Sequence, residues 1–248
     1  IKVFNPQVSK HGWKSSHTII EIIVKDMPFL VDSVRIALNR LGLSPHLLLN
    51  APINIVRNNK NEITHLSASS EKSIKTTSVE TVFFIEIDRQ TEQSALDFVT
   101  KDLKSVMDDI LLTVSDWSPM LAKLKSVIGD VNKAKLPCSQ EEKTNTLDFL
   151  EWLSQNNFTI MGYRSYAVKV LEGDIALEAN VQSSLGLMKR STGTKQRLIS
   201  SLSESARNFA LGDNLLILTK TNSRSRVHRP AQLDYIGVKR FDENGNVI

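Results

Sequence analysis

The chain has 248 residues, of which 41% are hydrophobic and 23% charged, and its formal net charge is +4. These values are typical of a globular protein with one large or two small domains, and folding should hide roughly 70% of the unfolded surface. No apolar run approaches the length of a membrane span, and no signal peptide is visible. A single cysteine, Cys138, excludes an internal disulfide framework and any two-cysteine zinc or redox motif.

The spacing of the ten glycines excludes two large classes of nucleotide-binding enzyme. The closest two, Gly186 and Gly193, are seven residues apart. A dinucleotide fingerprint needs glycines two and three residues apart, and a phosphate-binding loop needs them five apart. The five histidines show no HExxH spacing, and no GxSxG nucleophile turn is present. We therefore expect no catalytic residue, no metal ligand and no cofactor-binding residue in this chain.

The first half of the chain predicts a small antiparallel sheet with helices on one face. Residues 18–24 are a β-branched run typical of a strand buried on both faces, and a helix is expected between Pro28 and Gly42. Asp26 is expected to cap that helix, with Pro28 in its first turn. Further strands are predicted at about 46–57, 63–66 and 79–88, followed by helices over 92–114 and from 118 onward. This β-α-β-β-α order begins a βαββαβ ferredoxin-like sandwich, whose closing strand must come from residues 1–4 or from another segment.

The second half predicts a mixed domain after a boundary at residues 134–140. Ser139 and Glu142 form a capping-box pattern at the start of a helix that reaches Gln155. Strands are expected at about 158–170, 175–177, 215–219 and 233–241. Residues 242–245 predict a hairpin turn whose return strand is cut off after Ile248, so we expect a fragment truncated at its C-terminus. The fold class is therefore α+β.

Positive charge is concentrated between Lys189 and Arg229. Nine Lys or Arg and two acids give this stretch an excess of +7 and leave the remaining chain at −3. A solvated loop, or a basic surface facing an acidic neighbouring domain, is the favoured interpretation, because charge runs are mostly solvated. A carboxylate or anion site at Arg224, Arg226 or Arg229 stays open, since arginine forks fit carboxylates. Nucleic-acid binding is disfavoured, because no aromatics interleave with the charges and residues 82–88 lack the basic, glycine-containing RNA motif.

The turn that joins the first strand to the first long helix is a candidate effector site. Free N–H groups at the helix N-terminus would hold a carboxylate, and Asp32 would meet an ammonium group. The candidate residues are Asp26, Phe29, Leu30, Asp32 and Ser33, together with Arg224, Arg226 and Arg229 of the basic stretch. The competing interpretation is that Asp26 only caps the helix and Phe29 only fills the core.

Several stretches resemble the large bacterial NAD-specific glutamate dehydrogenases, in the same order and nearly end to end. They include DMPFLVDSV at 26–34, LNRLGL at 38–43, IEIDRQT at 85–91, FTIMGYR at 158–164, and residues 218–225, 227–230 and 235–241. The resemblance implies the N-terminal regulatory part of that family, with an ACT-type domain and helical extension over 1–133 and a PAS-like domain over 139–248.

The resemblance also implies a function for the parent protein. A cytoplasmic homo-oligomeric enzyme would convert L-glutamate, NAD and water to 2-oxoglutarate, ammonia and NADH, with the NAD site elsewhere in the parent chain. This fragment is expected to be inactive alone, to contact other domains of the same chain and to respond to an amino-acid effector, without nucleic-acid or membrane partners. The alternative is a stand-alone amino-acid-sensing or nucleic-acid-binding α+β module.

One departure from the ACT pattern bears on the effector. In ligand-binding ACT domains the first strand–helix turn usually reads Asp-x-Pro-Gly-Leu, and the glycine admits the ligand. Phe29 stands at that glycine position here. The departure favours a role in packing or subunit assembly over amino-acid binding.

Overall fold

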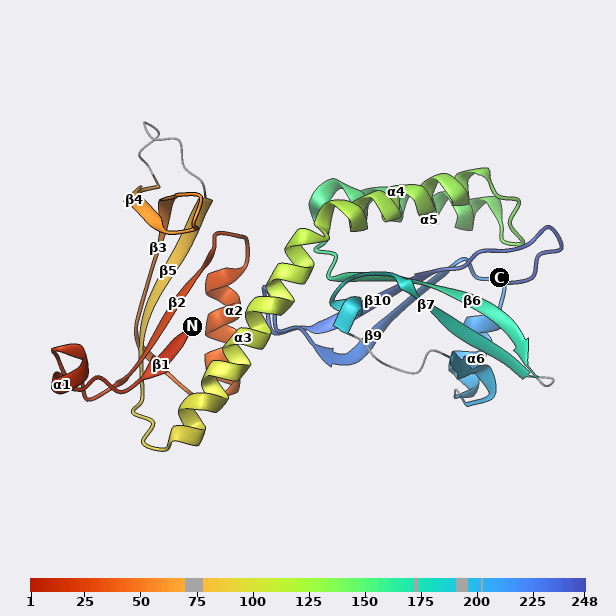
Figure 1. The fold of residues 1–248 in the computed structure, drawn as a ribbon. Helices are drawn as coiled ribbons and strands as arrows, with labels where there is room; N and C mark the ends of the chain where they lie inside the picture. The colour runs from red at the N-terminus through yellow and green to blue at the C-terminus, as the bar shows by residue number, and fades with distance from the viewer. Residues whose placement is uncertain (70–77, 172–173, 191–195, 202) are drawn as a thin grey trace. The chain divides into compact units, whose positions relative to one another are not determined.

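The computed structural model describes residues 1–69, 78–171, 174–190, 196–201 and 203–248 (Figure 1). The chain forms two compact units. The first contains residues 1–110 and 225–230, and the second contains residues 111–224 and 231–248. A short segment from late in the chain therefore folds with the first unit, which the sequence did not predict.

The first unit is built on one antiparallel sheet in the order β1-β2-β5-β3-β4. Its strands are β1 (Lys2–Phe4), β2 (Thr18–Lys25), β3 (Pro45–Arg57), β4 (Ile63–Ala68) and β5 (Ser78–Ile87). Three helices accompany them: α1 (Val8–His11), α2 (Leu30–Arg40) and α3 (Gln93–Ser115). Because β1 pairs with β2, the closing strand comes from residues 2–4, one of the two predicted sources.

The core of the first unit lies between the sheet and helices α2 and α3, which occupy the same side of it (Figure 1). Alternate side chains of β5 are fully or nearly fully buried, including Phe83 and Ile85, as a half-covered strand requires. Leu38 of α2 and Leu103 of α3 are also fully buried. The prediction that β2 is buried on both faces was wrong beyond its first residues, because Ile23 is 62% exposed on the face without helices.

The second unit combines two helices with two small antiparallel sheets. Helices α4 (Trp117–Lys133) and α5 (Gln140–Trp152) run side by side (Figure 1). A turn over Leu153–Asn157 follows them, in which Gln155 and Asn156 leave the helical conformation. One sheet has the order β6-β7-β8 and the other pairs β9 with β10. The strands are β6 (Gly162–Leu171), β7 (Asp174–Gly186), β8 (Gln196–Leu198), β9 (Leu216–Arg224) and β10 (Gln232–Val238).

The remaining elements of the second unit are short. They are 3-10 turns at Leu187–Arg190 and Ile199–Ser201 and helix α6 (Glu204–Leu211). The hairpin turn predicted at 242–245 is present, with the Gly245 N–H donating to the Asp242 carbonyl and Phe241 bridged to Val247. Both units confirm the α+β class with antiparallel sheets, and no described helix is long and apolar enough to cross a membrane.

A buried carboxylate ties α4 to the end of β7. Asp116, 8% exposed, accepts hydrogen bonds from the Gly186 N–H at 2.7 Å and from the Lys189 ammonium at 2.9 Å. Gly186 has a φ of 58°, and a Cβ there would lie 2.3 Å from the Met161 carbonyl, so only glycine fits this junction. Burial alone would raise the pKa of Asp116, but the hydrogen bonds and positive charge outweigh it and lower the pKa.

We expect Asp116→Asn to lower the free energy of unfolding by about 1 kcal/mol at pH 7, because the ion pair with Lys189 is lost. The pKa of Asp116 is lower in the folded than in the unfolded chain, so its stabilisation is present above about pH 4 and is lost at lower pH. Urea unfolding at pH 7 and pH 3.5 measures this. The control is Asp130→Asn on the exposed side of α4; an equal loss in both variants would contradict the assignment.

Candidate functional site

The turn between β2 and α2 differs from the predicted cap. Asp26 does not cap the helix: its carboxylate accepts a hydrogen bond from the Thr81 hydroxyl at 2.5 Å, and its N–H donates to the Val79 carbonyl. The N-cap position belongs to Phe29, and Pro28 lies ahead of the first helical turn. The predicted Asp26 cap was therefore wrong, because its side chain is held by β5 and the chain needs three further residues to reach the helix.

Phe29, at the glycine position of the ACT pattern, has a backbone conformation that favours glycine. Its φ is 73° and its ψ is 1°, in the left-handed region, which costs a residue with a Cβ roughly 1–2 kcal/mol. The turn therefore places an aromatic ring on left-handed backbone. That ring lies 4.9 Å from the ring of His228, centroid to centroid. Strained backbone of this kind persists only where surrounding contacts hold it.

Residues 225–230, which we call the docked segment, pack against this turn. The backbone N–H of His228 donates to the Ser33 hydroxyl at 3.2 Å, and Ser33 is fully buried. Val227 is also fully buried, and Ser225 is 6% exposed. The Ser225 hydroxyl accepts from the Val227 N–H and donates to the Val227 carbonyl, which folds the segment tightly on itself. The predicted effector site is therefore in contact with the chain itself.

Arg226 of the docked segment is held by α3. Its guanidinium lies 3.3 Å from an Asp102 carboxylate oxygen and 3.5 Å from one of Asp109, and it donates to the Ser105 hydroxyl at 3.2 Å. Asp109 is 5% exposed, and Asp102 also pairs with Arg40 of α2 at 2.5 Å. Buried carboxylates require such partners, because an unpaired charge away from water is strongly unfavourable.

The other predicted site residues are distributed less tightly. Leu30 is buried in the core at 4% exposure, whereas Asp32, Arg224 and Arg229 are exposed. The structure therefore brings together Phe29, Ser33 and Arg226 of the predicted set. The residues that complete their surroundings were not predicted, because no local pattern links a loop to partners more than 120 positions away.

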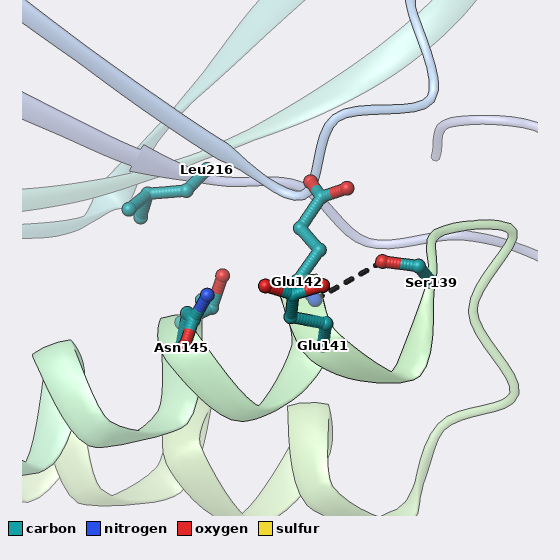
Figure 2. A pocket seen from close by; sticks show the side chains of 6 residues that line it. Ser139, Glu141, Glu142, Asn145 and Leu216 are labelled. Atoms are coloured by element: carbon teal, nitrogen blue, oxygen red, sulfur yellow. Dashed lines mark hydrogen bonds between the residues drawn. The ribbon is translucent and has the colours of Figure 1, made fainter.

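A second candidate is a pocket of about 340 Å³ at the start of α5. It is lined by Ser139, Glu141, Glu142, Asn145, Thr146 and Leu216 (Figure 2). The Ser139 hydroxyl accepts from the Glu142 N–H at 3.1 Å, as the capping box predicts. The reciprocal half is absent: Figure 2 shows the Glu142 side chain directed away from Ser139, and its carboxylate accepts from the Leu215 N–H at 2.8 Å.

The titratable groups near this pocket do not form a reactive centre. Lys239 is 7% exposed, and its ammonium donates to the Gly212 carbonyl and to the Asn214 side chain. Burial lowers the pKa of Lys239, while Asp213 and Glu142 oppose the change. Burial raises the pKa of the Cys138 thiol, and the charge of Glu142 raises it further. A nucleophilic thiol needs the opposite, electropositive setting.

We expect Cys138 to react with a disulfide reagent such as DTNB at pH 8 several-fold more slowly than free cysteine, because a raised pKa leaves less thiolate. Glu142→Gln should speed the reaction by removing the nearby negative charge. Glu141→Gln, one residue earlier on the same helix, serves as the matched control. A wild-type rate equal to that of free cysteine, or equal acceleration in both variants, would contradict this assignment.

Comparison with known proteins finds a family model that matches most of the first unit and relatives that match the whole chain. Residues 1–103 match the family model described as the glutamate dehydrogenase ACT1 domain. The full chain is 34% identical to an NAD-specific glutamate dehydrogenase of Pseudomonas aeruginosa and 32% identical to one of Halomonas elongata, and in each case it spans 15% of the relative. A relative in Mycobacterium tuberculosis with the same name is 22% identical over 92% of the chain, which spans 13% of that protein.

The similarity thus extends over the whole chain but over a small part of each relative. The ACT1 match covers the sheet and most of the helices of the first unit, including the β2–α2 turn. The matches beyond residue 103 carry the relationship through the second unit. The chain is thus similar over its whole length to part of the NAD-specific glutamate dehydrogenases, and its first 103 residues match the ACT1 domain model of those enzymes.

Proposed function

We propose that this chain is a non-catalytic regulatory and assembly segment of an NAD-dependent glutamate dehydrogenase. The parent enzyme would oxidise L-glutamate to 2-oxoglutarate and ammonia and pass a hydride to NAD. The observation that carries the proposal is the ACT1 match over residues 1–103, together with similarity over the whole of this chain to enzymes named for this activity.

The sequence supports a division of labour between this segment and the rest of the parent. A dinucleotide site needs closely spaced glycines so that the backbone approaches the pyrophosphate, and the ten glycines here lack that spacing. We therefore place NAD binding and catalysis elsewhere in the parent chain. Each of the first two relatives has a long region outside the match in which these functions could lie, since the chain spans only 15% of its length.

The second half is proposed to be a PAS-like domain, with family domains over residues 1–133 and 139–248. Its support is the resemblance noted above and the mixed architecture of helices and antiparallel sheets. We further propose that the parent enzyme is a cytoplasmic homo-oligomer. In this assignment the basic stretch 189–229 serves contacts within the parent rather than nucleic-acid binding.

Between amino-acid sensing and scaffolding, the geometry of the β2–α2 turn favours scaffolding. Phe29 occupies the glycine position, and its ring lies against His228 instead of leaving that space to a ligand. Ser33 likewise already accepts a hydrogen bond from the chain. A free amino acid would have to compete with both contacts.

Calorimetry tests this choice. We expect no saturable heat when glutamate, aspartate or arginine is titrated into the chain, because the turn is filled from within. A saturable heat that disappears in Asp32→Ala, a change at an exposed position of the turn, would show amino-acid sensing instead. Arg35→Ala, exposed on the same helix, is the matched control.

A direct assay tests the non-catalytic role. The purified chain, incubated with L-glutamate and NAD, should produce no NADH absorbance at 340 nm above the rate without protein. A complete NAD-dependent glutamate dehydrogenase in the same buffer is the positive control. Turnover that scales with the concentration of the chain would refute the proposal.

A further inference from the structure

The docked segment has the character of a bound peptide. It is six residues long, lies between β9 and β10 in the chain, and belongs to the first unit. Three kinds of contact hold it: an apolar residue, Val227, that is fully buried; a backbone hydrogen bond to Ser33; and the Arg226 guanidinium on two carboxylates of α3. An apolar anchor, main-chain bonding and a charged anchor are the elements by which protein surfaces recognise peptides.

The docked segment contains buried polar atoms for which the described residues supply no hydrogen-bond partner. Among the described residues, the Nε atom of Arg226 and the Nδ1 atom of His228 are buried without a hydrogen-bond partner. Both would be hydrated if the segment left, and Phe29 would lose the ring that packs against its strained backbone. Unsatisfied buried polar atoms oppose docking, whereas the ion pairs and the burial of Val227 favour it. Because these contributions oppose each other, the segment can leave the first unit when the ion pairs or the burial of Val227 are weakened.

We propose that residues 225–230 are a built-in peptide ligand of the ACT unit, which fills the site beside the β2–α2 turn through Arg226, Val227 and His228. The surface formed by α2 and α3 is then a binding surface for a short arginine-containing peptide. An external ligand reaches the turn only after the segment leaves. This deepens the proposed function by naming the occupant of the ACT site, and it does not depend on the reaction of the parent enzyme.

Hydrogen exchange of the complete chain, followed by mass spectrometry, tests the proposal. In the unaltered chain the Val227 and His228 amides should exchange at least tenfold more slowly than in an unstructured peptide of the same sequence, because both are hydrogen-bonded. Arg226→Gln and Asp109→Asn should each abolish most of this protection and also speed exchange around Ser33. The first measurement uses the unaltered chain, so a folding defect in a variant cannot affect it.

Two matched variants control for loss of charge alone. Arg229→Gln removes an exposed arginine of the same segment, and Asp108→Asn removes an exposed carboxylate next to Asp109. Both should leave the exchange of residues 225–230 within twofold of the unaltered chain. Unprotected Val227 and His228 amides in the unaltered chain, or equal effects in control and test variants, would overturn the inference. Because no measurement here involves glutamate or NAD, such a failure is separate from a failure of the proposed function.

Discussion

The pairing of β2 with β5 is the interaction on which the first unit depends. The two strands align over eight residue pairs, from Thr18 with Ile87 to Lys25 with Glu80, and every other pair turns its side chains toward the helices. Ile20 and Ile85 face each other in this register and are both fully buried. A slip by one residue would bring the opposite side chains, including Glu21 and Glu86, into the core. The register therefore also determines where β2 ends and where the candidate site begins.

From that end the chain turns sharply into α2 through a left-handed residue that carries an aromatic side chain. Asp26 is hydrogen-bonded to Thr81 of β5, which anchors the start of the turn, and Phe29 takes the left-handed conformation at its end. The conformation is the one that a glycine adopts without cost. A phenylalanine there gains a contact with His228 that glycine lacks. The residue with the strained backbone is therefore also a residue that contacts the docked segment.

The charged residues of the chain also find their partners far away in the sequence. The basic stretch predicted three candidate arginines, and only Arg226 reaches carboxylates of α3, while Arg224 and Arg229 remain exposed. In the second unit, Glu142 has the position of a capping-box residue and yet binds the Leu215 N–H, 73 residues away. In both cases residue type indicated the chemistry, but the partner depended on the tertiary fold.

The sequence by itself determined the α+β class, the order of the strands and the two long helices in the first unit, the start of α5 at Ser139 and the absence of a dinucleotide fingerprint. These features follow from periodicity, turn residues and motif spacing, which act over a few positions. The short elements α1, β8 and α6 were missed, since none of them presents a long apolar repeat. Only the tertiary structure decided that Phe29 replaces Asp26 at the N-cap and that residues 225–230 occupy the turn. Those outcomes depend on contacts between residues far apart in the chain, whose free energies no local pattern encodes.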